Sequence, residues 1–518
     1  MLKRVLISCL NTVLCCSLVS SAAAKNLPGE AEARAREMEK AVFMASGAED
    51  TVLKIGLVDC LLYALKQNSE ILIKRIDPKL KEDDVRVARA EFEPIFSGGY
   101  SIEDNTELAS NVLQGATTFN SLDINFNAAA SGKLITGTEY AIDFLNERYK
   151  SDSSFQIFNP YFAVTPKVTI TQPLFKGFGI LVNRADIIIA KNNLAQSEKS
   201  FKDTAINTIS KTKTAYYNYV FSLENYSLDR LAFKRTIALL TINRARYKKG
   251  LMSSVDLLET EAAAAAKEKA VVSSAAAARK SEDELKLVTN LIDDPKVWNA
   301  KIELVDQPEF KLEEPDLLIC LKNSFIFRPD YQSAQIDLKS RDIKIQVAKN
   351  ALLPTVDLTG SYGLNGLEKS YGRAAQNANE NYIDWFAGVE VSIPWGSDDR
   401  AKYNQRKLEK AQAILNFKRL EQNIMIEVRD KVRDVRVQRR QVEVARLSRE
   451  KETQNYVAQK ERYAAGQVST HDMLDYQDKL TKAELDYAKA LIDYNIALIN
   501  LDKSQGITLA KNNIKLEE

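Results

Sequence analysis

Four long segments of this chain contain neither glycine nor proline. They cover residues 180–249, 251–294, 397–465 and 467–505. Since glycine and proline are the residues that most often interrupt a helix, each segment is predicted to form one continuous helix. At about 1.5 Å per residue, a helix of roughly 70 residues spans about 100 Å, which is too long for one compact domain. The segments therefore predict extended helical hairpins or coiled coils.

The segments belong to two copies of one plan. Residues 246–259 and 462–475 share Arg, Tyr, Gly, Ser, Asp and Leu at one constant spacing. Earlier landmarks pair in the same order, Pro94 with Pro354 and Pro173 with Pro394. The spacing is smaller for the second pair of prolines than for the first, so the first copy carries an insertion between Pro94 and Pro173. A repeat of this kind indicates an internal duplication.

A glycine separates the two helical segments of each copy. Gly250 and Gly466 follow basic residues, and Ser-Ser or Ser-Thr with a nearby acidic residue comes after them. This order is typical of a glycine that ends one helix and a serine that caps the next. Both sites are therefore predicted to be the tips of helical hairpins.

The N-terminus predicts export. Lys3 and Arg4 precede an apolar run that ends at a small-residue cleavage site, so residues 1–24 are predicted to be a signal peptide. Residues 25–50 follow as a periplasmic segment, and the repeats occupy 51–295 and 296–518. The mature chain keeps two cysteines, and its sequence predicts no disulfide framework, lipid anchor or transmembrane helix.

Between the two prolines of each copy the hydrophobic period changes to two. Strands are predicted within about 94–172 and 354–394, with about four per chain and further candidates in the insertion. Alternation alone does not distinguish an apolar face on a protein core from one on lipid. The export signal and the aromatic residues at the strand ends favour an outer-membrane barrel. Because four strands cannot close a barrel, several chains must share one.

Composition excludes several other classes of protein. The formal net charge of +2 lacks the basic excess of a nucleic-acid binder. The single histidine, His471, makes histidine catalysis or a multi-histidine metal site improbable, and the usual hydrolase and metalloprotease motifs are missing from the sequence. We therefore expect no enzyme, no cofactor and no resident metal.

Several motifs resemble TolC-like outer-membrane efflux proteins. They are the segment 169–179 followed by Asn183-Arg184-Ala185, the lead-in 56–68, Ala351-Leu352-Leu353-Pro354, and the paired tips. The resemblance covers residues 50–507 and implies a mostly α-helical homotrimer. Each protomer would give four strands to a 12-stranded outer-membrane barrel, continuous with a long helical tunnel in the periplasm. The trimer would be the exit duct of tripartite efflux or type I secretion, docking a periplasmic adaptor (membrane fusion) protein and an inner-membrane ABC or proton-driven transporter.

The resemblance also implies roles for the tips. Asp472 and Asp475, with Asp256 and Glu259 as their first-copy counterparts, would line the periplasmic aperture, where rings of carboxylates favour cations. A gate latch would join Tyr463 to Asp256, with Tyr247 as the counterpart of Tyr463. Val468 replaces the arginine that the family latch also uses. As an alternative, each acid could simply cap a helix or lie on its solvated face.

Two further groups of residues are candidates for a role. The hairpin tips would contact the adaptor through Gly250, Leu251, Met252, Gly466, Gln467 and Val468. The strand-to-helix junctions are marked by Pro173, Asn183, Pro394 and Asn404. The alternative reading is an exported periplasmic coiled-coil adaptor without its own channel, which would explain the hairpins but not the duplication or the alternating strands.

Overall fold

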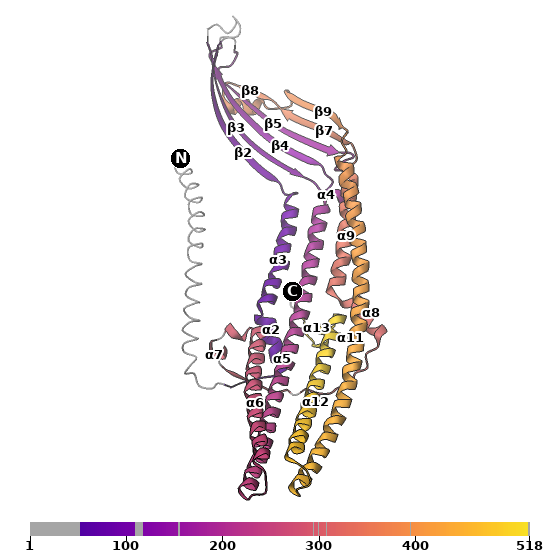
Figure 1. Ribbon diagram of the computed structural model, residues 1–518. Helices are drawn as coiled ribbons and strands as arrows, with labels where there is room; N and C mark the ends of the chain where they lie inside the picture. The colour runs from indigo at the N-terminus through magenta and orange to yellow at the C-terminus, as the bar shows by residue number, and fades with distance from the viewer. Residues whose placement is uncertain are drawn as a thin grey trace. The chain divides into compact units, whose positions relative to one another are not determined.

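A computed structural model of the chain describes residues 52–108, 118–153, 156–293, 295–298, 300–306, 308–393 and 395–515 (Figure 1). The predicted signal peptide and the segment 25–50 lie outside the described residues. The helices in chain order are α2 (Leu57–Gln67), α3 (Ser69–Ala90), α4 (Ile180–Asn183), α5 (Ala185–Lys248), α6 (Ser254–Thr289), η2 (Leu291–Asp293), α7 (Pro295–Trp298), α8 (Leu317–Phe327), α9 (Pro329–Asn350), α10 (Tyr371–Asn377), α11 (Asp398–Ala464), α12 (Thr470–Gln505) and α13 (Thr508–Lys511). The strands are β1 (Val52–Ile55), β2 (Ile95–Leu108), β3 (Thr118–Lys133), β4 (Glu139–Ser151), β5 (Tyr161–Pro173), β6 (Lys301–Leu304), β7 (Thr355–Leu364), β8 (Gly366–Glu368) and β9 (Ile383–Ser392).

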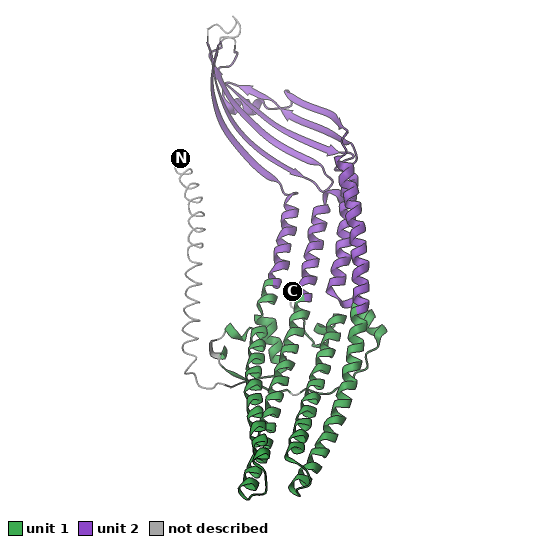
Figure 2. Ribbon diagram, viewed as in Figure 1, with its two compact units in different colours: residues 1–73, 204–324, 427–518 green, residues 74–203, 325–426 purple. Residues whose placement is uncertain are grey.

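The chain divides into two units, each built from separate stretches of the sequence (Figure 2). Unit 1 comprises residues 1–73, 204–324 and 427–518, and unit 2 comprises 74–203 and 325–426. Both units contain part of α5 and part of α11, the two longest helices, of 64 and 67 residues. The duplication explains this division, because each unit takes corresponding parts of both copies.

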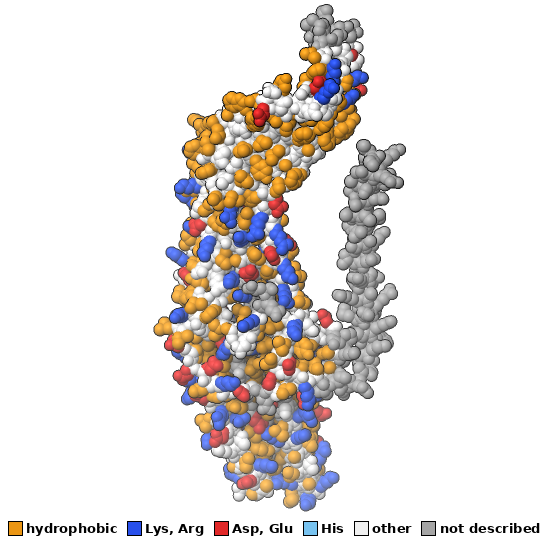
Figure 3. All heavy atoms as spheres, turned by 180° about the vertical axis from the view of Figure 1, so that it is seen from behind, with side chains coloured by type: hydrophobic (Ala, Val, Ile, Leu, Met, Phe, Trp, Pro, Cys, Tyr) orange, Lys and Arg blue, Asp and Glu red, His pale blue; other side chains and the backbone are white. Residues whose placement is uncertain are grey.

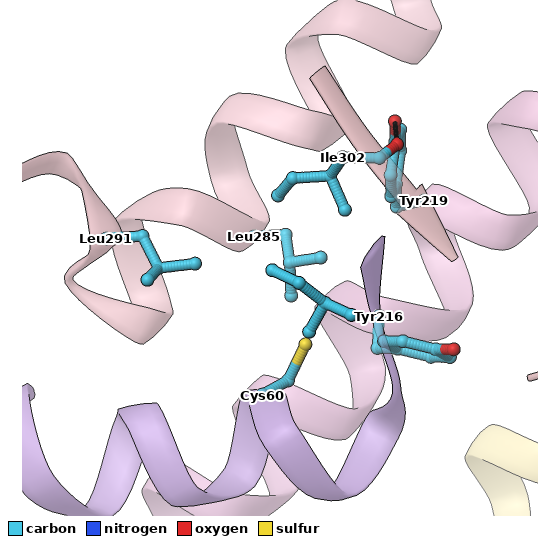
Figure 4. Close-up of a cluster of buried hydrophobic side chains, with 7 residues drawn as sticks. Cys60, Tyr216, Tyr219, Leu285, Leu291 and Ile302 are labelled. Atoms are coloured by element: carbon cyan, nitrogen blue, oxygen red, sulfur yellow. Dashed lines mark hydrogen bonds between the residues drawn. The ribbon is translucent and has the colours of Figure 1, made fainter. Parts of the chain in front are cut away.

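Unit 1 has a small core where β1 pairs in parallel with β6. The strands lie at the start of the first and second copies. Their residues Ile55 and Ile302 are buried with side chains of α2, α5 and α6, namely Cys60, Tyr216, Tyr219 and Leu285 (Figure 4). The Tyr219 hydroxyl donates a hydrogen bond of 2.9 Å to the carbonyl oxygen of Ile302, which satisfies its only polar atom in this apolar setting.

Unit 1 also holds both helical hairpins. The C-terminal part of α5 leads into α6, and that of α11 leads into α12, each through the turn at a glycine. Helix α12 is the most buried of the four at its C-terminal end, where Ala490, Ile492, Tyr494, Ala497 and Ile499 are covered. The long helices and their hairpins agree with the four segments that lack glycine and proline.

Unit 2 is built on one antiparallel sheet. The strand order is β2-β3-β4-β5-β7-β9, and the short β8 pairs with β5 beside β7. Pro173, Asn183 and the helices α3, α5, α9 and α11 lie at the ends of these strands in the sequence. Successive long strands pair antiparallel with one another, and in the second copy the short β8 and α10 lie between β7 and β9.

The register of the sheet gives it one apolar and one polar face. One row of directly opposite residues crosses all six strands: Phe96, Ala130, Ile142, Val168, Tyr362 and Trp385. The adjacent row is mostly polar and faces the other way: Ser97, Ala129, Asp143, Lys167, Gly363 and Asp384. The apolar row is solvent-exposed in the single chain, with Val168 41% and Trp385 70% accessible. Figure 3 shows hydrophobic side chains gathered over the sheet.

The predicted fold class is confirmed, and the expected number of strands is exceeded. The fold is mostly α-helical with one sheet, and the two copies repeat the same order of elements. The second copy supplies two long strands, as expected. Within the described residues the first copy supplies four long strands instead of two, because the insertion between Pro94 and Pro173 adds two strands. Within the described ranges, none of the helices is long and apolar enough to cross a membrane.

Candidate functional site

The two hairpin tips have the same backbone structure. Gly250 and Gly466 adopt positive φ angles of 71° and 75°, a conformation that glycine enters without strain. The amide of Leu251 donates to the carbonyl of Arg246, and that of Gln467 donates to the carbonyl of Arg462, each at 2.9 Å. These bonds close the helix with a Schellman motif. The predicted turn therefore exists at both tips.

Serine caps the helix that follows each tip. The hydroxyl of Ser253 accepts a 3.1 Å hydrogen bond from the amide of Asp256, and Ser469 does the same for Asp472 at the same distance. The hydroxyls in turn donate to the carboxylates, at 2.9 Å for Asp256 and 2.6 Å for Asp472. Asp256 and Asp472 therefore occupy equivalent capping positions, where their charge also favours the positive end of the helix.

The other two candidate acids have different partners. Asp475 forms an ion pair of 2.7 Å with Lys479 one turn along α12. Glu259 on α6 reaches His471 on α12, with Oε1 and Nδ1 2.6 Å apart. His471 thus links the two hairpins, although the equivalent position in the first copy is Val255. The ion pair of Asp475, by contrast, lies within its own helix.

The contact with Glu259 affects the protonation of His471. The hydrogen bond to the Glu259 carboxylate raises the pKa of the imidazole, and the charges of Glu259, Asp472 and Asp475 raise it further. The attraction between the two side chains is present while the imidazole is protonated and is lost as the pH rises through this raised pKa. Because His471 is exposed, solvent weakens this attraction.

The predicted latch between Tyr463 and Asp256 is absent from this structure. The Tyr463 hydroxyl instead donates a 2.5 Å hydrogen bond to Oδ1 of Asn243, and Asp256 is held by Ser253. Tyr463 is buried among Leu239 and Met473, and its hydroxyl lies between Asn243 on α5 and the hydroxyl of Thr470, which is 3.3 Å away. Tyr247, its counterpart in the first copy, is 45% exposed and lies outside this cluster.

Arg246 holds Tyr463 from a second direction. Its guanidinium carbon lies 4.8 Å from the centre of the Tyr463 ring, within the range of a cation–π contact. One guanidinium nitrogen also donates to the Tyr463 carbonyl oxygen at 3.2 Å. Arg246 is thus both part of the first turn and a link to the second hairpin.

Ion pairs join the hairpins further from the tips, and the sequence alone did not predict them. Arg235 of α5 makes two hydrogen bonds, of 3.0 and 2.9 Å, to the carboxylate of Glu484 on α12, and both side chains are largely buried. Lys267 of α6 lies 2.6 Å from Asp478 of α12. In both pairs the partners come from different copies and are far apart in the sequence, so no local pattern indicates them. The bidentate arginine pair is the stronger of the two because its geometry is fixed.

The first tip exposes apolar side chains. Leu251, Val255 and Leu258 are each about 70% accessible, and Met252 is partly covered. On the second tip Gln467 is exposed and Val468 packs against the cluster around Tyr463. The two tips share one backbone but present different surfaces.

The first strand-to-helix junction is held by asparagine side chains. Pro173 ends β5, and Asn183 donates from its buried side chain to the carbonyls of Gly177 at 2.7 Å and Gly179 at 3.0 Å. Asn350 of the second copy accepts from the Gly177 amide at 2.8 Å. In the second copy, Pro394 lies outside the described residues, and Asn404 is exposed on α11. The two junctions are therefore not equivalent.

The described part of the chain contains no group of three or more His, Cys, Asp or Glu side chains placed to hold a metal ion. The tips therefore offer single carboxylates from one chain. Any larger group of carboxylates would need more than one chain.

Comparison with known proteins connects these features with a family. The family model for outer membrane efflux proteins matches residues 62–291 and 323–506, which is most of the chain. Nodulation protein T of Rhizobium leguminosarum bv. trifolii is 26% identical over 176 residues, 32% of this chain and 35% of that relative. The matched stretch thus spans about a third of the relative's length.

Two solved structures share the fold. The CmeC outer membrane channel of Campylobacter jejuni has a TM-score of 0.65 at 17% identity, covering 89% of this chain and 87% of that one. The MtrE outer membrane channel of Neisseria gonorrhoeae, solved in its open state, has a TM-score of 0.61 at 17% identity, covering 87% and 88%. These likenesses extend over both copies of the duplicated plan.

Proposed function

Because the chain belongs to the outer membrane efflux protein family, the family of TolC-like channels, we propose that it is an outer-membrane duct. Three protomers would form a channel that crosses the outer membrane of a Gram-negative cell and continues as a helical tunnel in the periplasm. The channel would be the exit for tripartite efflux or type I secretion. We expect no catalytic step, since the CmeC and MtrE structures that share its fold are outer membrane channels.

The observation that carries this proposal is the exposed apolar face of the sheet. In β9 every second residue from Ile383 to Val391 lies on that face and is apolar. The ten residues of β9 cover about 34 Å at 3.4 Å each. A strand tilt of about 40° reduces this to roughly 26 Å of height, which matches the apolar band of an outer-membrane barrel. A face of this size is costly to leave in water.

The open edges of the sheet support assembly from several copies. A single sheet that ends in lipid would leave the backbone groups of its outer strands without hydrogen-bond partners. Closing a barrel removes both edges. A homotrimer in contact with outer-membrane lipid satisfies this requirement and is the assembly that the family resemblance implies.

The tips are the proposed contact with the other components. A periplasmic adaptor would bind at Gly250, Leu251, Met252, Gly466, Gln467 and Val468, and would connect the duct to an inner-membrane ABC or proton-driven transporter. Leu251, Val255 and Leu258 supply exposed apolar area that a helical partner could cover. The turn structure gives the two glycines a sufficient reason of their own, so the adaptor contact depends mainly on their neighbours.

The acids on the second tip are the proposed selectivity element. Asp472 and Asp475 lie three residues apart on α12, and Asp256 and Glu259 repeat the spacing on α6. In a trimer each position becomes a ring of three carboxylates. Such rings attract cations and are blocked by divalent ions that bridge them.

Removing the charges of Asp472 and Asp475 should open this entrance to anions and weaken its block by divalent cations. The pair Asp472→Ala with Asp475→Ala is expected to raise single-channel conductance and to weaken block by Mg²⁺ about tenfold or more, which corresponds to about 1.4 kcal/mol of lost ion binding. Planar-bilayer recordings of the reconstituted trimer measure both quantities.

Asp472→Asn with Asp475→Asn is the control for structure. An asparagine can still accept the hydrogen bond from the Ser469 hydroxyl, so the cap persists while the charge is lost. The Asn pair should give the same electrical change as the Ala pair. If both pairs leave conductance and block unchanged, these residues do not line the aperture.

A further inference from the structure

The sheet has more strands than the family resemblance implies. That resemblance gives each protomer four strands, whereas the continuous path in the described part of this chain contains six. Since β2 begins directly after Pro94, as β7 begins directly after Pro354, the insertion adds two strands between Pro94 and Pro173. The strands β2 and β3 are full parts of the sheet, because β2 pairs with β3 along its length and β3 is in register with β4 from Ser121 to Lys133.

The path of six strands ends in two open edges of matching direction. Each neighbouring pair is antiparallel, so β2 and β9 run in opposite directions at the two ends of the sheet. The outer edge of β2 and that of β9 have no strand partner within the described residues. The edge strand of one protomer can therefore pair antiparallel with the opposite edge strand of the next protomer, and repetition of this contact closes a ring.

Side chains at both edges fit a position in lipid. Phe96, Tyr100 and Ile102 of β2 lie on the apolar face and are largely exposed, as are Trp385 and Val389 of β9. Apolar area therefore extends to both ends of the sheet. If the barrel closed at β4 instead, the β2–β3 hairpin would be left outside it with exposed backbone groups.

The other face of the β2–β3 hairpin fits the interior of a barrel. On that face β2 carries Ser97, Gly99, Ser101 and Glu103, and β3 carries Asn125 and Asn127. Small and polar side chains are typical of the inward face of large barrels that enclose water. The hairpin thus continues the alternation of the other four strands.

We propose that β2 of each protomer pairs with β9 of the next protomer, so that three protomers close one barrel of eighteen strands. This inference rests on the proposed function, and it replaces the twelve strands that the resemblance implies. Because barrel diameter grows roughly in proportion to strand number, the barrel would be about one and a half times as wide as one of twelve strands. The outer-membrane part would then admit bulkier cargo than a twelve-stranded barrel.

Cysteine cross-linking tests which strands meet between copies. Ser97→Cys or Ser101→Cys on β2 is combined with Asp384→Cys, Gly388→Cys or Glu390→Cys on β9, all on the polar face. Within one chain β2 and β9 are separated by four strands, about 24 Å, so a disulfide between them can form only between two protomers. The native Cys60 and Cys320 are buried and can stay in place.

After oxidation of outer membranes, at least one β2–β9 combination should give covalent dimers and trimers on denaturing gels. Each single-cysteine variant lacks the thiol on the other strand and should therefore form no β2–β9 disulfide. The same β9 positions are also paired with Asp143→Cys and Glu147→Cys on β4. A native trimer with β4–β9 adducts, or with no β2–β9 adduct in any combination, overturns the eighteen-stranded barrel. Absence of the trimer from the outer membrane before oxidation contradicts the proposed function itself.

Discussion

Val168→Lys should prevent the chain from assembling in the outer membrane, whereas Thr169→Lys, one residue further along β5, should be tolerated. Val168 lies in the apolar row that crosses all six strands, and Thr169 lies in the polar set on the other face. A lysine near the middle of the lipid-facing surface destabilises a barrel by about 2–4 kcal/mol. A lysine on the inward face meets water, as Lys167 would.

The measurement is the amount of trimer recovered from outer membranes, together with urea unfolding of protein refolded in lipid vesicles. Val168→Ala separates the loss of side-chain volume from the added charge and should retain most of the trimer. If the apolar face were exposed to water, as in a soluble adaptor, Val168→Lys would be harmless. Equal behaviour of the two lysine variants would therefore contradict the assignment of the faces.

Tyr463→Ala should release the second hairpin from the first at the tip. The substitution removes a buried ring from the cluster with Leu239 and Met473 and leaves the buried Asn243 without its 2.5 Å hydrogen bond. Replacing a large buried aromatic side chain by alanine costs about 3–5 kcal/mol. Hydrogen exchange should accelerate in the helical segments around residues 236–260 and 456–477, while the sheet should keep its protection.

The duplication supplies the matched control for this experiment. Tyr247 occupies the same position in the first copy, but it is half exposed and lies outside the cluster, so Tyr247→Ala should change stability by about 0.5 kcal/mol or less. Tyr463→Phe should lose an intermediate amount of stability, about 1–3 kcal/mol, since it keeps the ring and leaves the Asn243 acceptor unpaired. Equal exchange rates for the Tyr247 and Tyr463 alanine variants would rule out the cluster as the element that holds the tips together.

Much of the fold could be predicted because its signals are local. A run of residues without glycine or proline predicts a helix from neighbouring positions alone, and Gly250 and Gly466 mark the turns by their own conformational requirement. The alternation in β7, β9 and β5 likewise indicates which face each side chain occupies. Comparison of the copies then relates the helices without any knowledge of contacts.

The number of strands was harder to predict, and the reason lies in β2. Its sequence from Ile95 to Leu108 contains two adjacent glycines and a polar outer half, so its alternation is weak. The alternation of residues 122–126 and 140–144, together with the insertion in the first copy, indicated that further strands could exist.

The partners of the polar residues at the tips could not be read from the sequence. The family pattern paired Tyr463 with Asp256, but Tyr463 instead bonds Asn243 on α5, in the other copy of the duplicated plan. Nothing around Asn243 marks it as a partner. The same applies to Arg235 and Glu484, whose pairing depends on how α5 and α12 pack. The copies also diverge here, since Asn183 holds its junction while Asn404 is exposed.

We propose that this chain forms a trimeric channel in the outer membrane. To test this, the membranes of cells that produce the full chain are separated, and the mass of the detergent-solubilised protein is determined by light scattering. We predict a complex of three chains in the outer-membrane fraction that conducts ions in planar bilayers. A soluble monomer in the periplasmic fraction would contradict the claim.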